Sequence, residues 1–217
     1  MIACATGKTL ERGGRDMSRS GSPRVITKVD RETELALVSG VRAGDAAAFD
    51  VVYAEFNGRL FAFLARLTRR REIAEELLEE TWLRFVRHAN RLEPDTQLGA
   101  WLFAVARNLH VSYCRTRLVE SEVIGGLALW PSRVMETPFE TTARNEFEQR
   151  LEEGLAALSP TLREALLLVA VEGMQASEAA FVCDTTAAAI RQRVRRARVL
   201  LAGRLGYLDE WCWRTGA

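Results

Sequence analysis

Residues 178–198 read EAAFVCDTTAAAIRQRVRRAR, and this stretch decides how the second half of the chain folds. A short helical pattern stops at the polar Asp-Thr-Thr break, and a second helical pattern follows it. The second pattern carries five arginines and no acidic residue. Its apolar residues recur every three or four positions, so they share one buried stripe and leave the arginines at the surface. The stripe consists of Ile190, Val194, Ala197, Leu201 and Leu205.

Two short helices joined by a tight polar turn, the second of them basic, are the outline of a helix-turn-helix. The second helix of that motif enters the major groove, where arginine bonds to guanine, glutamine bonds to adenine, and further arginines hold phosphates. We expect Arg191, Gln192 and Arg195 to read bases, and Arg196 and Arg198 to hold phosphates. A solvated basic helix is the alternative, but the preceding helix and turn favour DNA. The full predicted set of residues that contact DNA through this motif is Thr185, Thr186, Arg191, Gln192, Arg193, Arg195, Arg196 and Arg198.

The basic character of the chain is local. The 217 residues carry a net charge of only +1, which is low for a protein that binds DNA unaided, because affinity for duplex depends largely on neutralised phosphates. Residues 31–116 hold twelve arginines and twelve acids, whereas residues 185–208 hold six arginines and no acid. We therefore expect DNA binding to need a helper protein.

The cysteines are scattered singly at positions 4, 114, 183 and 212, without the spacing of a zinc site, a redox motif or a disulfide framework. No stretch is long enough for a membrane span or a secretory signal, so we expect a cytoplasmic protein. We also expect no metal, no cofactor and no enzymatic activity, because no nucleophile and base pair or phosphate-cradling glycine loop is present. The two histidines are isolated, as ordinary surface or packed residues are.

Apolar residues recur at helical spacing along the whole chain, which predicts an all-α fold. Residues 1–30 lack that pattern and are expected to form a disordered leader, with Met17 as an alternative start. Helices are expected from about residue 35 to Gly44, and over 46–67, 72–89 and 98–115, forming one domain over 31–116. A linker follows at 117–140, where Gly125, Gly126, Pro131 and Pro138 interrupt the pattern. Helices near 142–158, 160–172, 176–183 and 186–205 form a second domain over 141–208, and 209–217 is a tail.

Four stretches, in order, resemble a bacterial sigma-70 family sigma factor of the extracytoplasmic-function (ECF) group. LALVSGVRAGDAAAFDVVY at 35–53 resembles the family's opening helix and its Gly-Asp turn. AEELLEETWLR at 74–84 is similar to the segment that docks on the polymerase clamp, and WLFAVARNLHVSYCR at 101–115 to the promoter-melting segment. Residues 178–198 align without a gap to the helix-turn-helix that reads the upstream promoter element. The resemblance implies a transcription initiation factor with core RNA polymerase and promoter DNA as partners and an anti-sigma factor as its inhibitor.

The same resemblance assigns roles within the first domain. An exposed glutamate ridge suits a basic protein helix better than DNA, which fits Glu75, Glu76, Glu79 and Glu80 as polymerase contacts. A solvated helix face is the alternative explanation of these acids. Side-chain donors beside an apolar face suit a separated DNA strand, which fits Arg107, Asn108, His110 and Arg115. Trp101 is expected in the core, and the loop 92–97 is implied to help form a pocket for a flipped base.

The chain departs from the family pattern at several positions. Glu79 replaces a usual Gln, Ser112 a usual Asp, Asp184 the glycine of the turn, and Ala188-Ala189 a Gly-Thr pair. Asp tolerates the left-handed backbone better than most residues, and Thr185 or Thr186 can supply the missing hydroxyl, so we expect the motif to fold. These changes leave room for a sigma-like decoy that sequesters an anti-sigma factor without initiating transcription. A stand-alone helix-turn-helix regulator would leave the acidic ridge and the Trp-Leu segment unexplained.

Overall fold

The computed structural model describes residues 31–123 and 146–205, and every regular element in these ranges is helical. This confirms the all-α prediction, with two helical domains joined by a linker. The predicted leader, the remainder of the predicted linker after residue 123, and the C-terminal tail lie outside the described residues.

The first domain contains α1 (Arg31–Ala43), α2 (Ala46–Thr68), α3 (Arg71–His88), the short 3-10 turn η1 (Ala89–Arg91) and α4 (Leu98–Val123). Gly44 makes the turn between α1 and α2 with φ of +80°, a conformation that glycine adopts without a Cβ penalty. Asp45 then caps α2, since its carboxylate accepts the Ala47 amide proton at 2.9 Å. The helices thus start and stop close to the predicted positions.

Aromatic side chains fill the space between α2, α3 and α4. Phe63 and Phe103 meet edge to face at 5.2 Å between ring centroids, and Phe85 lies 5.8 Å from Trp101. The Trp82 indole is buried, and its Nε1 donates to Asn57 Oδ1 at 3.0 Å. This pairing satisfies the polar edge of an otherwise apolar side chain.

Two details of the first domain differ from expectation. Val86 follows Trp82 by four residues, a spacing that predicts an inward position on α3, but its side chain is 57 % exposed. The fourth helix was expected to end near Arg115 but continues to Val123, through the first residues of the predicted linker. The run from Thr116 to Val123 contains no glycine or proline to stop it.

The second domain contains α5 (Glu146–Ala156), α6 (Pro160–Leu166), the π-helical turn η2 (Leu167–Val171), α7 (Ala176–Val182) and α8 (Ala187–Leu205). Helices α5, α6 and α7 all pack on α8. Gly154 allows the close approach of α5 to α8, because a Cβ at that position would lie 2.5 Å from Leu201 Cδ1. The apolar stripe of α8 is buried at Ile190, Val194 and Ala197, as predicted.

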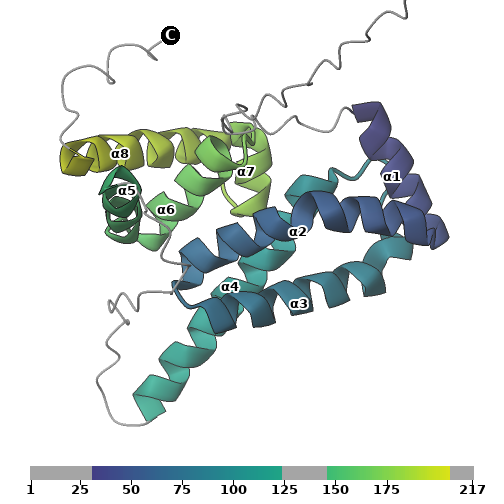
Figure 1. Cartoon of the computed structure of the whole chain (residues 1–217), viewed down its shortest axis with the longest axis horizontal. Coiled ribbons are helices and arrows are strands. Elements are labelled where there is room, and N and C mark those ends of the chain that lie inside the picture. The colour runs from purple at the N-terminus through teal and green to yellow at the C-terminus, as the bar shows by residue number, and fades with distance from the viewer. Residues whose placement is uncertain (1–30, 124–145, 206–217) are drawn as a thin grey trace, which may run out of the picture.

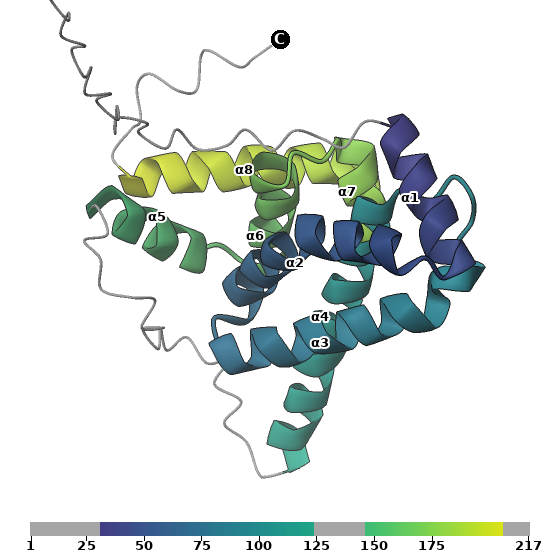
Figure 2. The same ribbon diagram turned by 45° about the vertical axis from the view of Figure 1, so that its right-hand side comes forward.

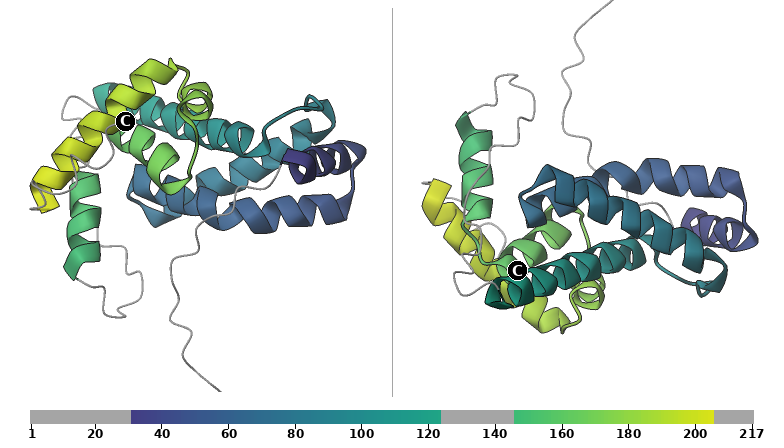
Figure 3. Two further views of the ribbon diagram at one scale, coloured as in Figure 1. Left: turned by 90° about the horizontal axis from the view of Figure 1, so that it is seen from above. Right: turned by 90° about the horizontal axis from the view of Figure 1, so that it is seen from below.

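The two domains pack against each other. Helix α4 contacts α7, and the C-terminal half of α2 contacts α6. Figure 1 shows α2 lying between the second domain and α3, and Figure 2 shows the end of α4 projecting beyond the other helices. In both views of Figure 3, α5 and α8 lie at one end of the molecule and α1 at the other. The second domain therefore covers part of the surface of α2 and α4.

Candidate nucleic-acid interface

The turn between α7 and α8 has helix-turn-helix geometry. Asp184 adopts φ of +49°, the left-handed conformation expected where the resembled family has glycine. The Thr185 amide donates to the Ala180 carbonyl at 3.0 Å and so closes the end of α7. Thr186 Oγ1 accepts the Ala189 amide proton at 3.1 Å, which caps the start of α8. The departures at residues 184, 188 and 189 leave the motif intact.

Helix α8 presents its basic side chains to solvent. Arg193 is half-buried, and within the described part of the chain none of the five predicted arginines of α8 forms an ion pair. Unpaired guanidinium groups on one helix are available for phosphate oxygens and base edges. The exposed members of the predicted set are Thr186, just before α8, and Arg191, Gln192, Arg195, Arg196 and Arg198 on it.

The four donors predicted on α4 divide into two pairs. Asn108 and Arg115 are exposed, whereas Arg107 and His110 are half-buried on the side of the second domain. Arg107 Nε donates to Glu164 Oε1 of α6 at 2.7 Å. Of these four donors, only Asn108 and Arg115 are therefore open to a DNA strand in this arrangement.

His110 is neutral at physiological pH in this fold. Its burial, with the charges of Arg107 and Arg163 nearby, lowers its pKa to about 4. Its Nε2 lies 3.5 Å from the Cys114 sulfur. Close by, Cys183 at the end of α7 is buried, and burial together with the Glu164 carboxylate raises its pKa to about 12.

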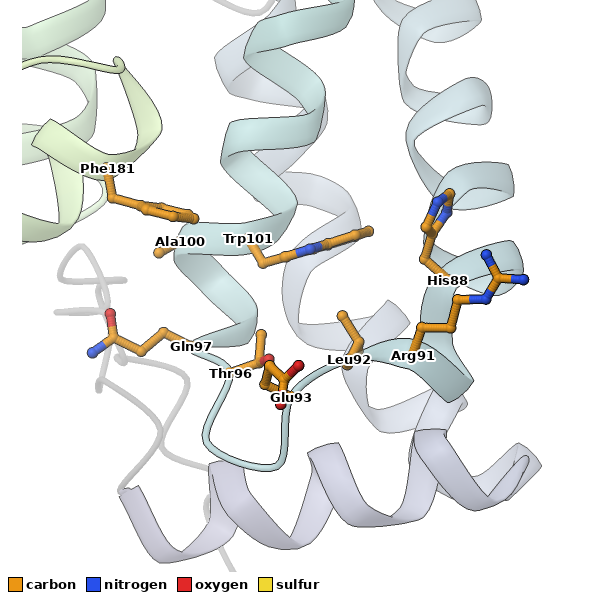
Figure 4. Close-up of a pocket in the computed structure, with 9 residues that line it drawn as sticks. All are labelled: His88, Arg91, Leu92, Glu93, Thr96, Gln97, Ala100, Trp101 and Phe181. Atoms are coloured by element: carbon orange, nitrogen blue, oxygen red, sulfur yellow. The ribbon is translucent and has the colours of Figure 1, made fainter.

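The loop between η1 and α4 borders a cavity of about 420 Å³. Trp101 is only half-buried and lines this cavity, so it is not wholly a core residue as predicted. In Figure 4, Phe181 reaches from the α7 side towards Ala100, across the pocket from His88 and Arg91. The pocket is lined by His88, Arg91, Leu92, Glu93, Thr96, Gln97, Ala100, Trp101 and Phe181. An aromatic ring beside polar groups suits a single unstacked base.

The predicted acidic ridge lies on the outer face of α3. Glu75 pairs with Arg71 at 2.8 Å and Glu80 pairs with Arg84 at 2.9 Å, both within the helix. The ion pair with Arg84 also lowers the pKa of Glu80. Glu76 and Glu79 are exposed and form no ion pair within the described residues, so they carry the uncompensated charge of the ridge.

Several residues of these surfaces were missed from the sequence. Leu83 and Val86 are exposed apolar side chains on α3, 50 % and 57 % accessible. Glu164, Glu172 and Phe181 belong to the contact between the domains. The sequence contained one signal for the two acids. Glu164 stands directly before the apolar run ALLLVAVEG at 165–173, and Glu172 lies within it. Acids are rarely buried in such a run unless they are paired.

Comparison with known proteins identifies the family. The chain is 35 % identical over 150 residues to the ECF RNA polymerase sigma factor EcfG of Rhodopseudomonas palustris, covering 69 % of this chain and 80 % of that protein. The chain belongs to the ECF RNA polymerase sigma factors. Residues 52–118 of this ECF sigma factor match the model of sigma-70 region 2, and residues 148–201 match that of sigma-70 region 4.

Two further similarities agree with this assignment. This ECF sigma factor is 30 % identical to the RNA polymerase sigma factor CarQ of Myxococcus xanthus, over 77 % of this chain and 95 % of CarQ. Its structure resembles that of the sigma factor RpoE, solved in complex with the anti-sigma factor NepR from Bartonella quintana, with a TM-score of 0.63 and 26 % identity. That match covers 75 % of this chain and 98 % of the RpoE chain. The region 2 and region 4 matches fall on the two observed helical domains.

Among residues 31–123 and 146–205, no helix is long and apolar enough to cross a membrane. In the same ranges, no three His, Cys, Asp or Glu side chains come together as a possible set of metal ligands.

Proposed function

We propose that this ECF sigma factor binds core RNA polymerase, recognises an upstream promoter element through α8, and holds the melted downstream element through α4 and the adjoining loop pocket. It is not itself an enzyme, since the polymerase supplies the chemistry. The contacts to polymerase come from the ridge on α3, chiefly Glu76 and Glu79.

The observation that carries the proposal is the surface of α8. Its guanidinium groups project from a correctly capped recognition helix and are not neutralised by ion pairs to described residues. A decoy that only sequesters another protein has no need of such a helix. The low overall charge fits a protein that receives part of its DNA affinity from a partner.

An anti-sigma factor is proposed as a second protein partner. Support comes from the structural relative RpoE, which was solved with the anti-sigma factor NepR. Affinity purification of the chain from its own cells should recover an additional protein besides polymerase subunits. Recovery of polymerase subunits alone would count against this part of the proposal.

Reconstitution tests the main function. The purified chain is mixed with core RNA polymerase, complex formation is measured by gel filtration, and transcripts from fragmented genomic DNA are sequenced. Discrete start sites that share an upstream motif, absent with core polymerase alone, are the expected result. Polymerase binding without initiation would point instead to a decoy.

A further inference from the structure

The short loop between η1 and α4 is held by the first turn of α1. The loop runs from Leu92 to Gln97, and the buried side chains of Leu92 and Leu98 anchor its two ends. Helix α1 contacts η1, and Figure 4 shows α1, in faint purple, running along the loop. Two residues of α1, Arg31 and Glu34, form hydrogen bonds to this segment.

The Glu34 carboxylate joins α1 to the start of α4. Its Oε1 accepts the backbone amide proton of Leu98 at 2.9 Å, and its Oε2 accepts from Arg31 Nη1 at 2.8 Å. Leu98 is the first residue of α4, so its amide has no acceptor within the helix and needs one from elsewhere. A carboxylate at this end of a helix is also favoured by the helix dipole. Glu34 therefore caps a helix that begins 64 positions later in the sequence.

Arg31 connects the same carboxylate to the middle of the loop. Its Nη2 donates to the Asp95 carbonyl oxygen at 2.6 Å, while its Nη1 is bonded to Glu34. Within the loop, the Thr96 amide donates to the Glu93 carbonyl oxygen at 3.0 Å and closes a turn. The turn and the two contacts from α1 together fix the backbone of the loop.

The bonds from α1 fall on either side of two residues that line the loop pocket. Asp95 directly precedes Thr96, and Leu98 directly follows Gln97. Thr96 and Gln97 border the pocket together with Trp101. Gln97 is exposed, so its position depends on the backbone more than on packing. Polar side chains discriminate between bases only where their donors and acceptors are held in place.

We propose that Arg31 and Glu34 are positioning residues for the loop pocket: they hold the backbone of residues 95–98 so that Thr96 and Gln97 are already placed to discriminate a flipped base. This inference rests on the proposed function, in which the pocket takes a base of the melted element. A loop that is ordered in advance does not have to be ordered on binding, which strengthens and sharpens recognition. Both residues act through the loop backbone and not through contact with the base.

The test measures base preference in the complex of the full chain with core polymerase. The probe is a fork-junction DNA library, randomised in its duplex and in its single-stranded downstream segment, and the bound fraction is sequenced. Glu34→Ala removes both bonds of the carboxylate. Glu34→Gln keeps an oxygen for the Leu98 amide and is the conservative variant. Glu32→Ala is the matched control, because Glu32 is an exposed acid of α1 that forms no ion pair with described residues.

The wild-type complex should prefer one base at one single-stranded position. Glu34→Ala should reduce this preference about tenfold, the size expected when one or two side chains have to be ordered on binding. Glu34→Gln should regain most of the preference, and Glu32→Ala should match the wild type. The preference for duplex bases, which α8 is proposed to read, should be the same in all four proteins.

Two outcomes of the selection overturn the proposal. One is an unchanged single-stranded preference in Glu34→Ala. The other is an equal loss of preference at duplex and single-stranded positions, because a general loss of structure would have that effect.

Arg31→Met guards against misfolding of Glu34→Ala. The Arg31 side chain is 47 % exposed, so its replacement leaves the core intact, and Glu34 can still cap α4. This variant should lower the single-stranded preference about threefold, since one of the two contacts from α1 is lost. Its matched control is Arg42→Met, which removes another exposed arginine of α1 and should match the wild type. An unchanged preference in Arg31→Met contradicts the role of Arg31.

Amide hydrogen exchange of the free chain, followed by mass spectrometry, reports the loop without DNA. Exchange over residues 92–98 should be faster in Glu34→Ala and in Arg31→Met than in the wild type, and unchanged in Arg42→Met. Exchange as slow as in the wild type in both Glu34→Ala and Arg31→Met contradicts the positioning role.

The positioning role and the proposed function fail in different ways. If the wild-type complex initiates transcription and selects a base that Glu34→Ala selects equally well, the positioning role alone is wrong. If the wild-type complex neither initiates nor selects any single-stranded base, while exchange of the loop still depends on Glu34, the proposed function is wrong.

Discussion

Arg191 is an exposed residue in the N-terminal part of α8, where side chains of a recognition helix reach base edges. Arg191→Ala should cost about 1–3 kcal/mol of binding to the preferred promoter and relax the choice of base at one position. Binding selections on randomised promoter libraries, made with the polymerase complex, measure both effects.

Arg198→Ala is the matched comparison, because this exposed side chain lies farther along α8 and is expected to contact phosphate. It should weaken binding to all sequences about equally and reduce the salt dependence of affinity. The same uniform weakening in Arg191→Ala would reassign Arg191 to the DNA backbone.

His110 gives the fold a defined pH dependence. Its pKa is about 4 in the folded chain, against an ordinary 6.5, so the unfolded chain binds a proton first as pH falls. Neutral His110 therefore contributes to the free energy of unfolding fully above pH 6.5, and this contribution is lost as pH falls towards 4. It amounts to at most about 3 kcal/mol. Urea unfolding of the wild type and of His110→Gln at several pH values measures this loss.

The difference in unfolding free energy between wild type and His110→Gln should stay constant above pH 7. It should shift in favour of the variant between pH 6.5 and 4, because glutamine does not titrate. A constant difference over the whole range would mean that the imidazole is not held neutral by its burial and by the nearby charges of Arg107 and Arg163.

The acidic ridge on α3 predicts how charge reversal on this helix changes polymerase binding. Glu76→Lys with Glu79→Lys should weaken core polymerase binding about tenfold, because it reverses two charges that have no compensating arginine within the described residues. The effect should diminish at high ionic strength, as exposed charges are screened. Competition binding with a labelled sigma factor measures it.

The control for the ridge is Asp50→Lys with Glu153→Lys, which makes the same charge change on α2 and α5. Equal loss of polymerase binding in both double variants would show that net charge, and not this face of α3, determines affinity.

The extents of the helices were largely predictable because local pattern determines them. Gly44 and the Asp184 turn marked boundaries correctly, and the apolar stripe of α8 followed helical spacing. The end of α4 was misplaced because residues 116–123 contain no helix breaker, and the loss of a clear pattern was interpreted as a linker. The exposure of Val86 was not predictable from the spacing of apolar residues, since spacing does not distinguish a core position from an exposed apolar one.

For the whole molecule, the contact between domains predicts coupled unfolding. Buried groups of one domain are satisfied by the other, so the wild type should show a single calorimetric transition. Glu164→Gln with Glu172→Gln should separate this into two transitions or broaden it, because each domain then melts alone. Two well-separated transitions in the wild type would contradict a stable contact between the domains.

The pairing of the domains was the part of the candidate site that the sequence could not supply. Arg107 and Glu164 are 57 positions apart, and Arg59 and Glu172 are 113 positions apart. Periodicity places each side chain on a face of its own helix but contains no information about which faces meet. Arg107 was therefore predicted as an open DNA contact, while the structure places it against a carboxylate.

The buried thiol of Cys183 can report how often the surrounding structure opens. Its sulfur is enclosed where Glu164 and Arg107 meet, and a thiol with a pKa of about 12 supplies almost no thiolate at neutral pH. Alkylation at this atom can therefore proceed only as fast as the surrounding structure opens, as in amide hydrogen exchange. The rate at which native Cys183 is modified, followed by mass spectrometry, records how often the unmodified protein exposes this region, with no added label.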